Sequence, residues 1–169
     1  MKKILVAIFA VLLCGCLENE ASFDVINAGK IDVSYSNQRL MVSSDFNEKF
    51  DSSKSHSIKS QDSNKFVLFF FTSTCGVCKE QIPILEELFS QNVRIYGILG
   101  DIPNLTNATK FIESNHIKMP IFYQSNARRF FANATNGVKG VPVIAVFHNG
   151  KLTQKLVGLI PKSVLLHAI

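Results

Sequence analysis

The 169-residue chain contains no tryptophan, 4 cysteines and 5 prolines, and its excess of charge is small. It has 18 Lys and Arg against 13 Asp and Glu, and its longest basic runs are pairs such as Arg128-Arg129. This spread excludes the concentrated basic patch of a nucleic-acid-binding protein, so no nucleic acid is expected as a partner. What the chain has in plenty is phenylalanine, with 14 residues, and its hydrophobic content of 47% is enough for the core of one domain.

The N-terminus has the pattern of an export signal. Lys2 and Lys3 precede an apolar run over residues 4–13, which fits the apolar region of a secretory signal and is too short to span a bilayer. The run ends in Leu13-Cys14-Gly15-Cys16, which resembles the bacterial lipobox. That resemblance implies a signal peptide over residues 1–15, a lipid on the sulfur of Cys16, and a bacterial cell-envelope protein that is lipid-anchored to a membrane and faces the periplasm or the exterior. A plain signal peptide and an uncleaved anchor are the alternatives.

Processing at Cys16 would leave two free thiols in the chain, Cys75 and Cys78. They can then pair only with each other or with a partner protein. A structural zinc site is disfavoured because it takes four ligands, and the sequence offers neither a second cysteine pair nor a nearby histidine, so no metal is expected. An inert structural disulfide is also disfavoured, since so tight a loop constrains little of the unfolded chain. Redox exchange is favoured because the pair follows an apolar strand and opens a helix.

The first third of the chain differs in composition from the rest. Residues 17–64 are polar, and two alternating stretches around Asn27-Ala28-Gly29 predict a β-hairpin. Residues 43–65 are rich in Ser, Lys, Asp and Asn and are predicted to be a linker or a loose loop. We therefore expect residues 16–64 to form an N-terminal linker with a hairpin, and residues 65–169 to form the main domain.

The main domain alternates strands and helices. The run "FVLFFF" after Lys65 predicts a central strand covered on both faces. A helix with Pro83 inside it follows the cysteines, and a hairpin is predicted at Asn149-Gly150. The expected order is β, α, β, α, β, α, β, β, α, which predicts an α/β fold with a mixed central sheet flanked by helices.

The position of the two cysteines suggests a role for each. Cys75 is expected at a helix N-terminus, where backbone N–H groups and the helix dipole stabilise a thiolate, so it is the predicted nucleophile. Cys78 lies one turn further along the same helix face and is the predicted resolving thiol. Gly76 and Val77 lie between them and are expected to set the access of the substrate. No cofactor is expected beyond the disulfide of the pair itself.

With these features the sequence resembles the thioredoxin superfamily. The resemblance rests on "FVLFFFTSTCGVC", on "GVPVIAVFHNGK" and on the element order, and it covers about residues 65–169. It implies a thioredoxin-like domain with a cis-proline loop opposite the CxxC motif. Pro142 occupies the cis-proline position, and Val141 before it is the residue that pairs its backbone with the substrate in this superfamily.

Within the superfamily the chain is similar to the TlpA/ResA-like branch of membrane-tethered, extracytoplasmic thiol-disulfide proteins. Members of that branch commonly have a Glu-x-Pro sequence after the CxxC motif. Pro83 matches the proline, whereas Gln81 occupies the glutamate position with Glu80 next to it.

Two other positions depart from the superfamily pattern. Phe69 replaces a buried Asp that relays protons in cytoplasmic thioredoxins, and Thr74 replaces the Trp that usually precedes the first cysteine. Cys78 therefore has no evident built-in base, and Glu80, Lys79 or water are the candidates.

These observations lead to three functional hypotheses. The first is a lipid-anchored reductase of protein disulfides, for example of apocytochrome c thiols, which receives electrons from a membrane donor protein. The second is a disulfide oxidase or isomerase, with which Val141 is compatible because oxidase-type relatives often have Val before the cis-proline. The third is a non-catalytic binding lipoprotein on a thioredoxin scaffold, because fold alone does not fix function.

Overall fold

The computed structural model describes residues 19–43 and 65–169. The predicted signal peptide, Cys14, the predicted lipidation site Cys16 and residues 44–64 of the predicted linker lie outside these ranges. Eight strands and four helices follow one another as β1 (Asn19–Ile26), β2 (Gly29–Ser36), β3 (Arg39–Val42), β4 (Lys65–Phe71), α1 (Gly76–Ser90), β5 (Ile95–Leu99), α2 (Leu105–Ser114), β6 (Ile121–Phe122), α3 (Ser125–Ala134), β7 (Val143–His148), β8 (Lys151–Val157) and α4 (Lys162–Ala168).

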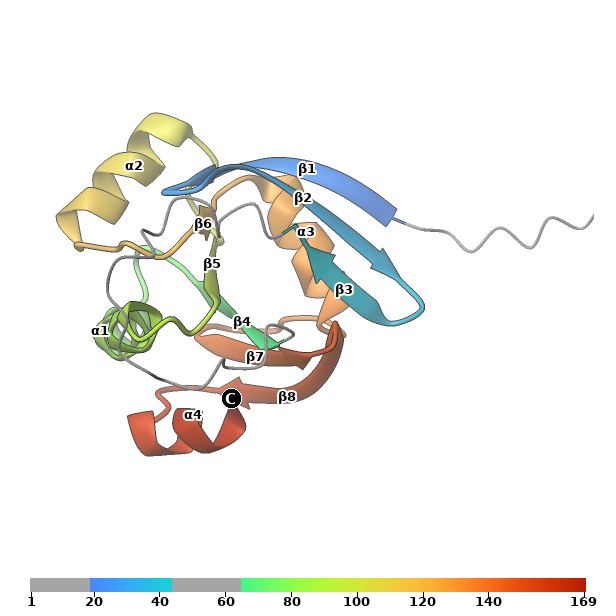
Figure 1. Cartoon of the computed structure of the whole chain (residues 1–169). Coiled ribbons are helices and arrows are strands. Elements are labelled where there is room, and N and C mark those ends of the chain that lie inside the picture. The colour runs from blue at the N-terminus through green and yellow to red at the C-terminus, as the bar shows by residue number, and fades with distance from the viewer. Residues whose placement is uncertain (1–18, 44–64) are drawn as a thin grey trace, which may run out of the picture.

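The strands form one mixed sheet in the order β3-β2-β1-β6-β5-β4-β7-β8 (Figure 1). β4, β5 and β6 run parallel to one another, and the other neighbouring pairs are antiparallel. From β4 onward the elements follow the predicted order, and the hairpin predicted at Asn149-Gly150 joins β7 to β8. The predicted fold class, an α/β fold with a mixed central sheet, is confirmed.

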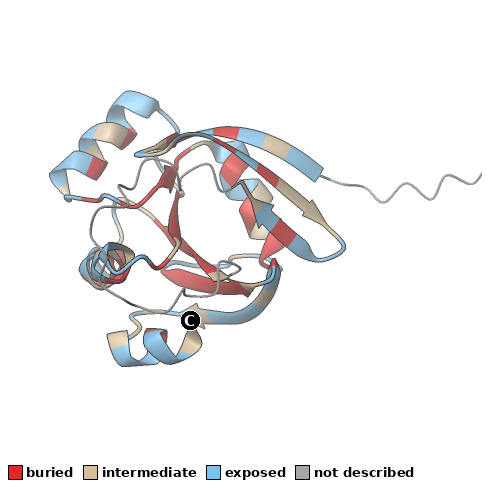
Figure 2. Cartoon of the chain, in the orientation of Figure 1, coloured by how far each residue is buried: buried red, intermediate tan, exposed pale blue. Residues whose placement is uncertain are grey.

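Apolar cores lie on both faces of the central sheet. Figure 2 shows the residues of its middle strands coloured as buried. Successive residues of β4 point to opposite faces, so Phe69 joins the core under α1, α2 and α4, whereas Leu68 joins the core under α3 and β1–β3. Both side chains have an exposed fraction of 0%. This two-sided cover explains why β4 is an unbroken apolar run and not an alternating one.

The N-terminal strands belong to the same sheet as the rest of the described chain. The predicted hairpin is present, since β1 pairs with β2 around a turn at Asn27, and β1 also pairs with β6. The Asn27 side-chain amide donates to the carbonyl oxygens of Ile117 (3.0 Å) and Met119 (3.2 Å), and the ring of Phe23 packs edge-on against that of Phe122. The strands from Asn19 onward are therefore part of the sheet, whereas the sequence analysis began the main domain at residue 65. The hairpin joins the sheet because one of its faces carries apolar residues that pack against α3.

The β7–β8 turn meets strand β3 at Gly150. The backbone N–H of Leu40 donates to the carbonyl oxygen of Gly150 at 2.7 Å. Gly150 has a φ of +74°, and a Cβ there would lie 2.8 Å from the carbonyl oxygen of Leu40. The tip of the hairpin thus needs glycine both for its backbone conformation and for the close approach of β3.

We expect Gly150→Ala to lower the free energy of unfolding by about 2–4 kcal/mol. The added Cβ would overlap the backbone of β3, and alanine would also be strained in a left-handed conformation. The measurement is urea unfolding of the purified protein. Gly29→Ala is the matched control, because Gly29 has a φ of +80° but nothing within 4 Å of the added Cβ, so it should lose only about 1 kcal/mol. Equal losses for the two variants would contradict the proposed contact between Gly150 and β3.

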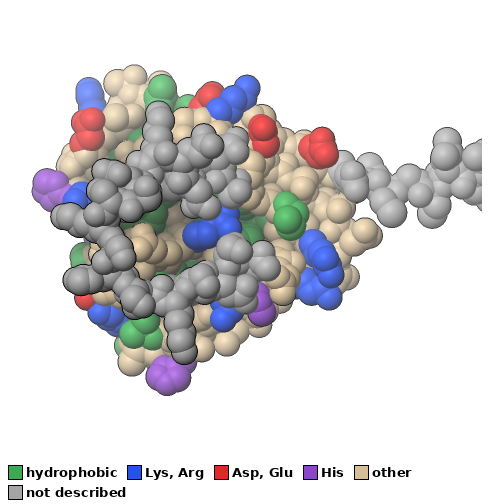
Figure 3. All heavy atoms as spheres, in the orientation of Figure 1, with side chains coloured by type: hydrophobic (Ala, Val, Ile, Leu, Met, Phe, Trp, Pro, Cys, Tyr) green, Lys and Arg blue, Asp and Glu red, His purple; other side chains and the backbone are tan. Residues whose placement is uncertain are grey.

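The surface carries charge of both signs. On the face seen in Figure 3, acidic and basic side chains are both present, with uncharged surface between them.

Candidate active site

The CxxC motif lies where β4 gives way to α1. β4 ends at Phe71, the N–H of Cys75 donates to the carbonyl oxygen of Thr72 at 3.3 Å, and α1 begins at Gly76 with Cys75 as its N-cap. The Cys75 sulfur accepts the N–H of Cys78 at 3.1 Å. A thiolate at Cys75 would therefore be stabilised by a hydrogen bond from this N–H and by the positive end of the helix dipole.

The two cysteines form a disulfide with their Cα atoms 5.2 Å apart. Cys78 has an exposed fraction of 0%, whereas Cys75 is partly exposed. Gly76 and Val77 between them are both exposed, and Val77 has an exposed fraction of 45%. A protein substrate can therefore approach the sulfur of Cys75 directly, and the sulfur of Cys78 lies behind it in the core.

The predicted proline loop is at the same end of the sheet as the cysteines. The peptide bond between Val141 and Pro142 is cis, as the superfamily resemblance implies. Val143 pairs with Phe70, so the residues just before β7 lie beside those just after β4. Pro142 is buried and its carbonyl oxygen accepts the N–H of Gly158 at 3.0 Å, whereas Val141 is exposed (37%) and is accessible to a substrate.

Asp101, which the sequence analysis did not select, holds the CxxC loop, the segment over residues 72–75 between β4 and α1, in place through Ser73. Its carboxylate accepts the backbone N–H of Ser73, with the two oxygens at 2.9 and 3.0 Å from the nitrogen, and the Ser73 hydroxyl at 2.6 Å. Asp101 lies two residues after the end of β5, which runs parallel to β4. The signal available in the sequence was a carboxylate just beyond a buried parallel strand, since the carboxyl ends of such strands lie at one edge of a sheet.

Of the three positions that depart from the family pattern, Phe69 and Gln81 are buried and uncharged, whereas Thr74 is exposed. Phe69 stacks on Phe71 with ring centroids 4.9 Å apart. Gln81 has an exposed fraction of 0%; its side-chain oxygen accepts the N–H of Ile160 at 2.7 Å, and its side-chain nitrogen donates to the carbonyl oxygen of Ile160 at 3.3 Å. Gln81 thus connects α1 to the segment before α4. Neither side chain can take a proton from Cys78.

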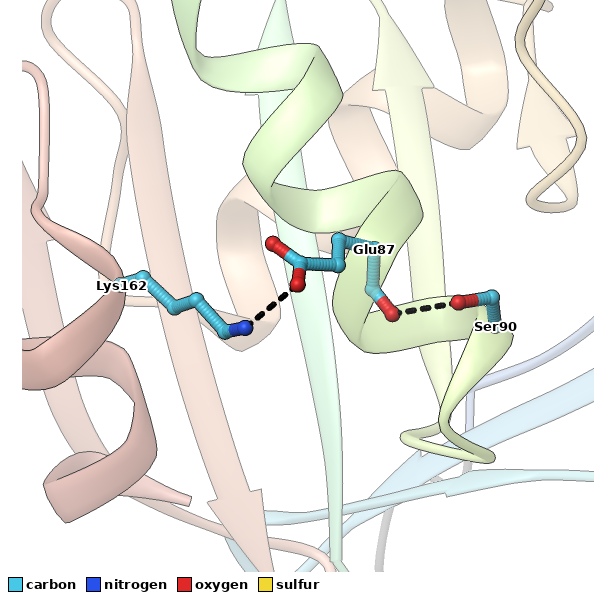
Figure 4. Close-up of polar contacts among 3 residues, drawn as sticks. All are labelled: Glu87, Ser90 and Lys162. Atoms are coloured by element: carbon cyan, nitrogen blue, oxygen red, sulfur yellow. Dashed lines mark hydrogen bonds and ion pairs between the residues drawn. The ribbon is translucent and has the colours of Figure 1, made fainter.

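A second contact joins the C-terminal helix to the helix that carries the cysteines. The Lys162 ammonium lies 2.6 Å from a carboxylate oxygen of Glu87, as Figure 4 shows, and the hydroxyl of Ser90 donates to the backbone oxygen of Glu87 at 2.7 Å. Both partners of the ion pair are substantially exposed, so this pair adds little to stability. The buried Gln81–Ile160 bonds and the buried side chain of Leu165 contribute more to the docking of α4.

The described residues hold no group of three or more His, Cys, Asp or Glu side chains placed to bind a metal ion. None of the helices within the same ranges is both long enough and apolar enough to cross a membrane. The candidate proton acceptors Lys79 and Glu80 are both exposed on α1.

The sequence matches the AhpC/TSA family over residues 42–153. The chain belongs to this family. Two solved structures similar to it are StoA from Bacillus subtilis and a protein from Chlorobium tepidum described as the thiol:disulfide interchange protein DsbE. StoA is 16% identical with a TM-score of 0.59, over 90% of this chain and 97% of StoA. The Chlorobium protein is also 16% identical with a TM-score of 0.59, over 89% of this chain and 90% of its own.

A third similar structure is a thioredoxin-related protein from Neisseria meningitidis serogroup B, which is 21% identical with a TM-score of 0.50, over 69% of this chain and 90% of its own. These likenesses confirm the predicted thioredoxin-like fold. Taken with the AhpC/TSA family match, they support the predicted TlpA/ResA-like member of the thioredoxin superfamily. Together with the Cys75–Cys78 disulfide, the family match is consistent with the predicted enzyme class, a thiol-disulfide oxidoreductase.

Proposed function

We propose that the chain is a thiol-disulfide oxidoreductase that reduces protein disulfides outside the cytoplasm. The observation that carries this proposal is the arrangement of the pair: a partly exposed cysteine at a helix N-cap, bonded to a buried cysteine one turn along the same helix. This arrangement suits a thiol that attacks first and a second thiol that completes the exchange.

The reaction begins from the reduced pair. The Cys75 thiolate attacks one sulfur of the substrate disulfide, which breaks the substrate's S–S bond and releases its other sulfur as a thiol. The Cys78 thiolate then attacks the Cys75 sulfur of the mixed disulfide and releases the second substrate thiol. Two electrons have passed to the substrate, and the product is the Cys75–Cys78 disulfide present in the structure. A membrane electron-donor protein would return two electrons to the pair.

The direction of exchange is the part of the proposal that most needs a test. The TlpA/ResA-like character supports a reductase, for which thiols of apocytochrome c are candidate substrates, whereas Val141 before the cis-proline is also compatible with a disulfide oxidase or isomerase. We expect the reduction potential of the pair, measured by equilibration with glutathione buffers, to lie near the roughly −270 mV of thioredoxin. A value near the roughly −120 mV of a strong oxidant would instead support the oxidase.

The proposed membrane anchor depends on one atom, the sulfur of Cys16. If it carries lipid, Cys16→Ala should move the protein from the membrane fraction to the soluble fraction, because a predicted apolar run of residues 4–13 is too short to hold it there. The measurement is cell fractionation followed by immunoblotting, and Cys14→Ala, which leaves the acceptor sulfur in place, is the matched control. Unchanged membrane association of Cys16→Ala would refute the lipid anchor and leave the proposed redox chemistry untouched.

A further inference from the structure

A cavity of about 120 Å³ lies between the CxxC loop and the proline loop. Thr72, from the turn that leads into Cys75, lines one side of it, and Gly140 and Val141 line another. Two basic residues, Arg128 of α3 and Lys139, also line it, and its described lining includes no acidic residue. The cavity therefore offers positive charge next to the position at which a substrate disulfide must be held.

The guanidinium of Arg128 is held against the backbone beside the CxxC loop. One of its nitrogens, Nη1, donates to the carbonyl oxygen of Gly100 at 3.1 Å. A Cβ on Gly100 would lie 3.5 Å from Nε of Arg128 and 3.3 Å from the carbonyl oxygen of Phe71, so the absent side chain leaves room for this approach. A guanidinium has five N–H donors, so others remain available to a ligand.

No ion pair with a carboxylate of the described residues neutralises the positive charges of Arg128 and Lys139 at this cavity. Asp101, which directly follows Gly100, has its carboxylate engaged by the N–H and the hydroxyl of Ser73. Both basic side chains are exposed. An incoming anion would meet two cations without having to displace a protein carboxylate.

We propose that this cavity binds an acidic side chain, aspartate or glutamate, that lies within two residues of the reactive cysteine of a polypeptide substrate. The inference rests on the proposed function and adds a substrate preference to it. The cavity is well above the roughly 10–15 Å³ that one water needs, so it has room for a carboxylate. The substrate chain would lie across the exposed Val141 and place one side chain between Arg128 and Lys139.

The test uses the purified, reduced protein and short peptides whose single cysteine is in a mixed disulfide with 2-mercaptoethanol. Glu or its uncharged isostere Gln is placed at each of the two positions before and after the cysteine, and single-turnover release of the free peptide thiol is measured. We expect the Glu peptide to react about three- to tenfold faster than the Gln peptide at one of these positions, as two exposed ion pairs would provide. The ratio should fall towards one at 1 M salt.

Variants of the two basic residues test whether the cavity causes the preference for the Glu peptide. Arg128→Gln combined with Lys139→Gln should bring the Glu-to-Gln ratio to about one, and using a ratio cancels general effects of the variant on the rate. Arg129→Gln is the matched control for the single change Arg128→Gln, which should by itself lower the ratio: each removes one positive charge from α3. Arg129 lines a different pocket, with Glu20 and Asn126, so its variant should keep the wild-type ratio.

The outcomes separate this inference from the proposed function. If every peptide is reduced and the Glu and Gln peptides react equally at all four positions, the substrate preference is refuted and the oxidoreductase stands. A preference that survives in the double variant, or that Arg129→Gln removes equally well, would also refute the cavity as its source. If no peptide is reduced, the proposed activity itself fails, and the inference fails with it.

Discussion

Replacing Cys75 with alanine is expected to abolish the reduction of insulin disulfides by the purified protein, with a loss of at least about a hundredfold in rate. The physical reason is accessibility combined with activation. Cys75 is partly exposed and its sulfur accepts a hydrogen bond from a helix N-terminal N–H, whereas Cys78 is buried. A substrate disulfide that cannot reach Cys78 has no other thiolate to react with in this site.

Cys75→Ala also removes the Cys75–Cys78 disulfide, so the assay needs a control for an effect of the substitution on folding. Wild-type and variant proteins should be compared by urea unfolding after full reduction, so that neither chain has a cross-link and a difference in folding is visible. Cys78→Ala is the paired variant, and it should still attack a disulfide once through Cys75. If Cys75→Ala kept full activity while Cys78→Ala lost it, the assignment of nucleophile and resolving thiol would be reversed.

The sequence predicted best those features that depend on local pattern. The apolar run of β4, the cysteines at the start of α1 and the turn at Asn149-Gly150 each follow from residues close together in the chain. The cis bond before Pro142 was expected from the family resemblance, because without it Pro142 reads only as a proline at the start of a strand.

Features that depend on contacts between distant segments could not be predicted in this way. β1 pairs with β6, and beside this pairing the Asn27 side chain donates to the backbone of Ile117, 90 residues away. The hydrogen bonds from Ser73 to Asp101 likewise join segments that only the parallel pairing of β4 and β5 brings together. A polar residue in a single sequence does not reveal which distant partner it will meet.

Gln81 shows how a departure from a family pattern can be structural. The sequence showed only that an amide stands where the TlpA/ResA-like branch commonly has a glutamate. The structure shows a buried amide that both accepts from and donates to the backbone of Ile160. A carboxylate could accept the N–H but could not donate to the carbonyl unless it were protonated, so the amide suits this pair of contacts better than an ionised glutamate would.

Replacing Cys78 with alanine is expected to trap substrates on the protein. The mixed disulfide on Cys75 is normally resolved by the sulfur bonded to it in the structure, which comes from one helical turn away. Alanine at position 78 removes that attacking group, so the mixed disulfide should persist until an external thiol reaches it. Expressed in its own cell and quenched with acid, Cys78→Ala should accumulate covalent adducts that dithiothreitol dissolves, seen on non-reducing gels as bands absent from wild type and from the Cys75→Ala/Cys78→Ala double variant.

The identity of the trapped partners would then decide between the directions of exchange. Cytochrome c precursors or a membrane electron carrier would support the reductase, whereas many unrelated secreted proteins with cysteines would support an oxidase or isomerase. Because Cys75 is partly exposed and Val141, in the loop at the same end of the sheet, is 37% exposed, a polypeptide substrate can approach this site. If the reduced variant formed no adduct even with a large excess of a denatured disulfide protein, the pair would not exchange with proteins, and a thioredoxin-fold binding protein with an idle disulfide would be the better description.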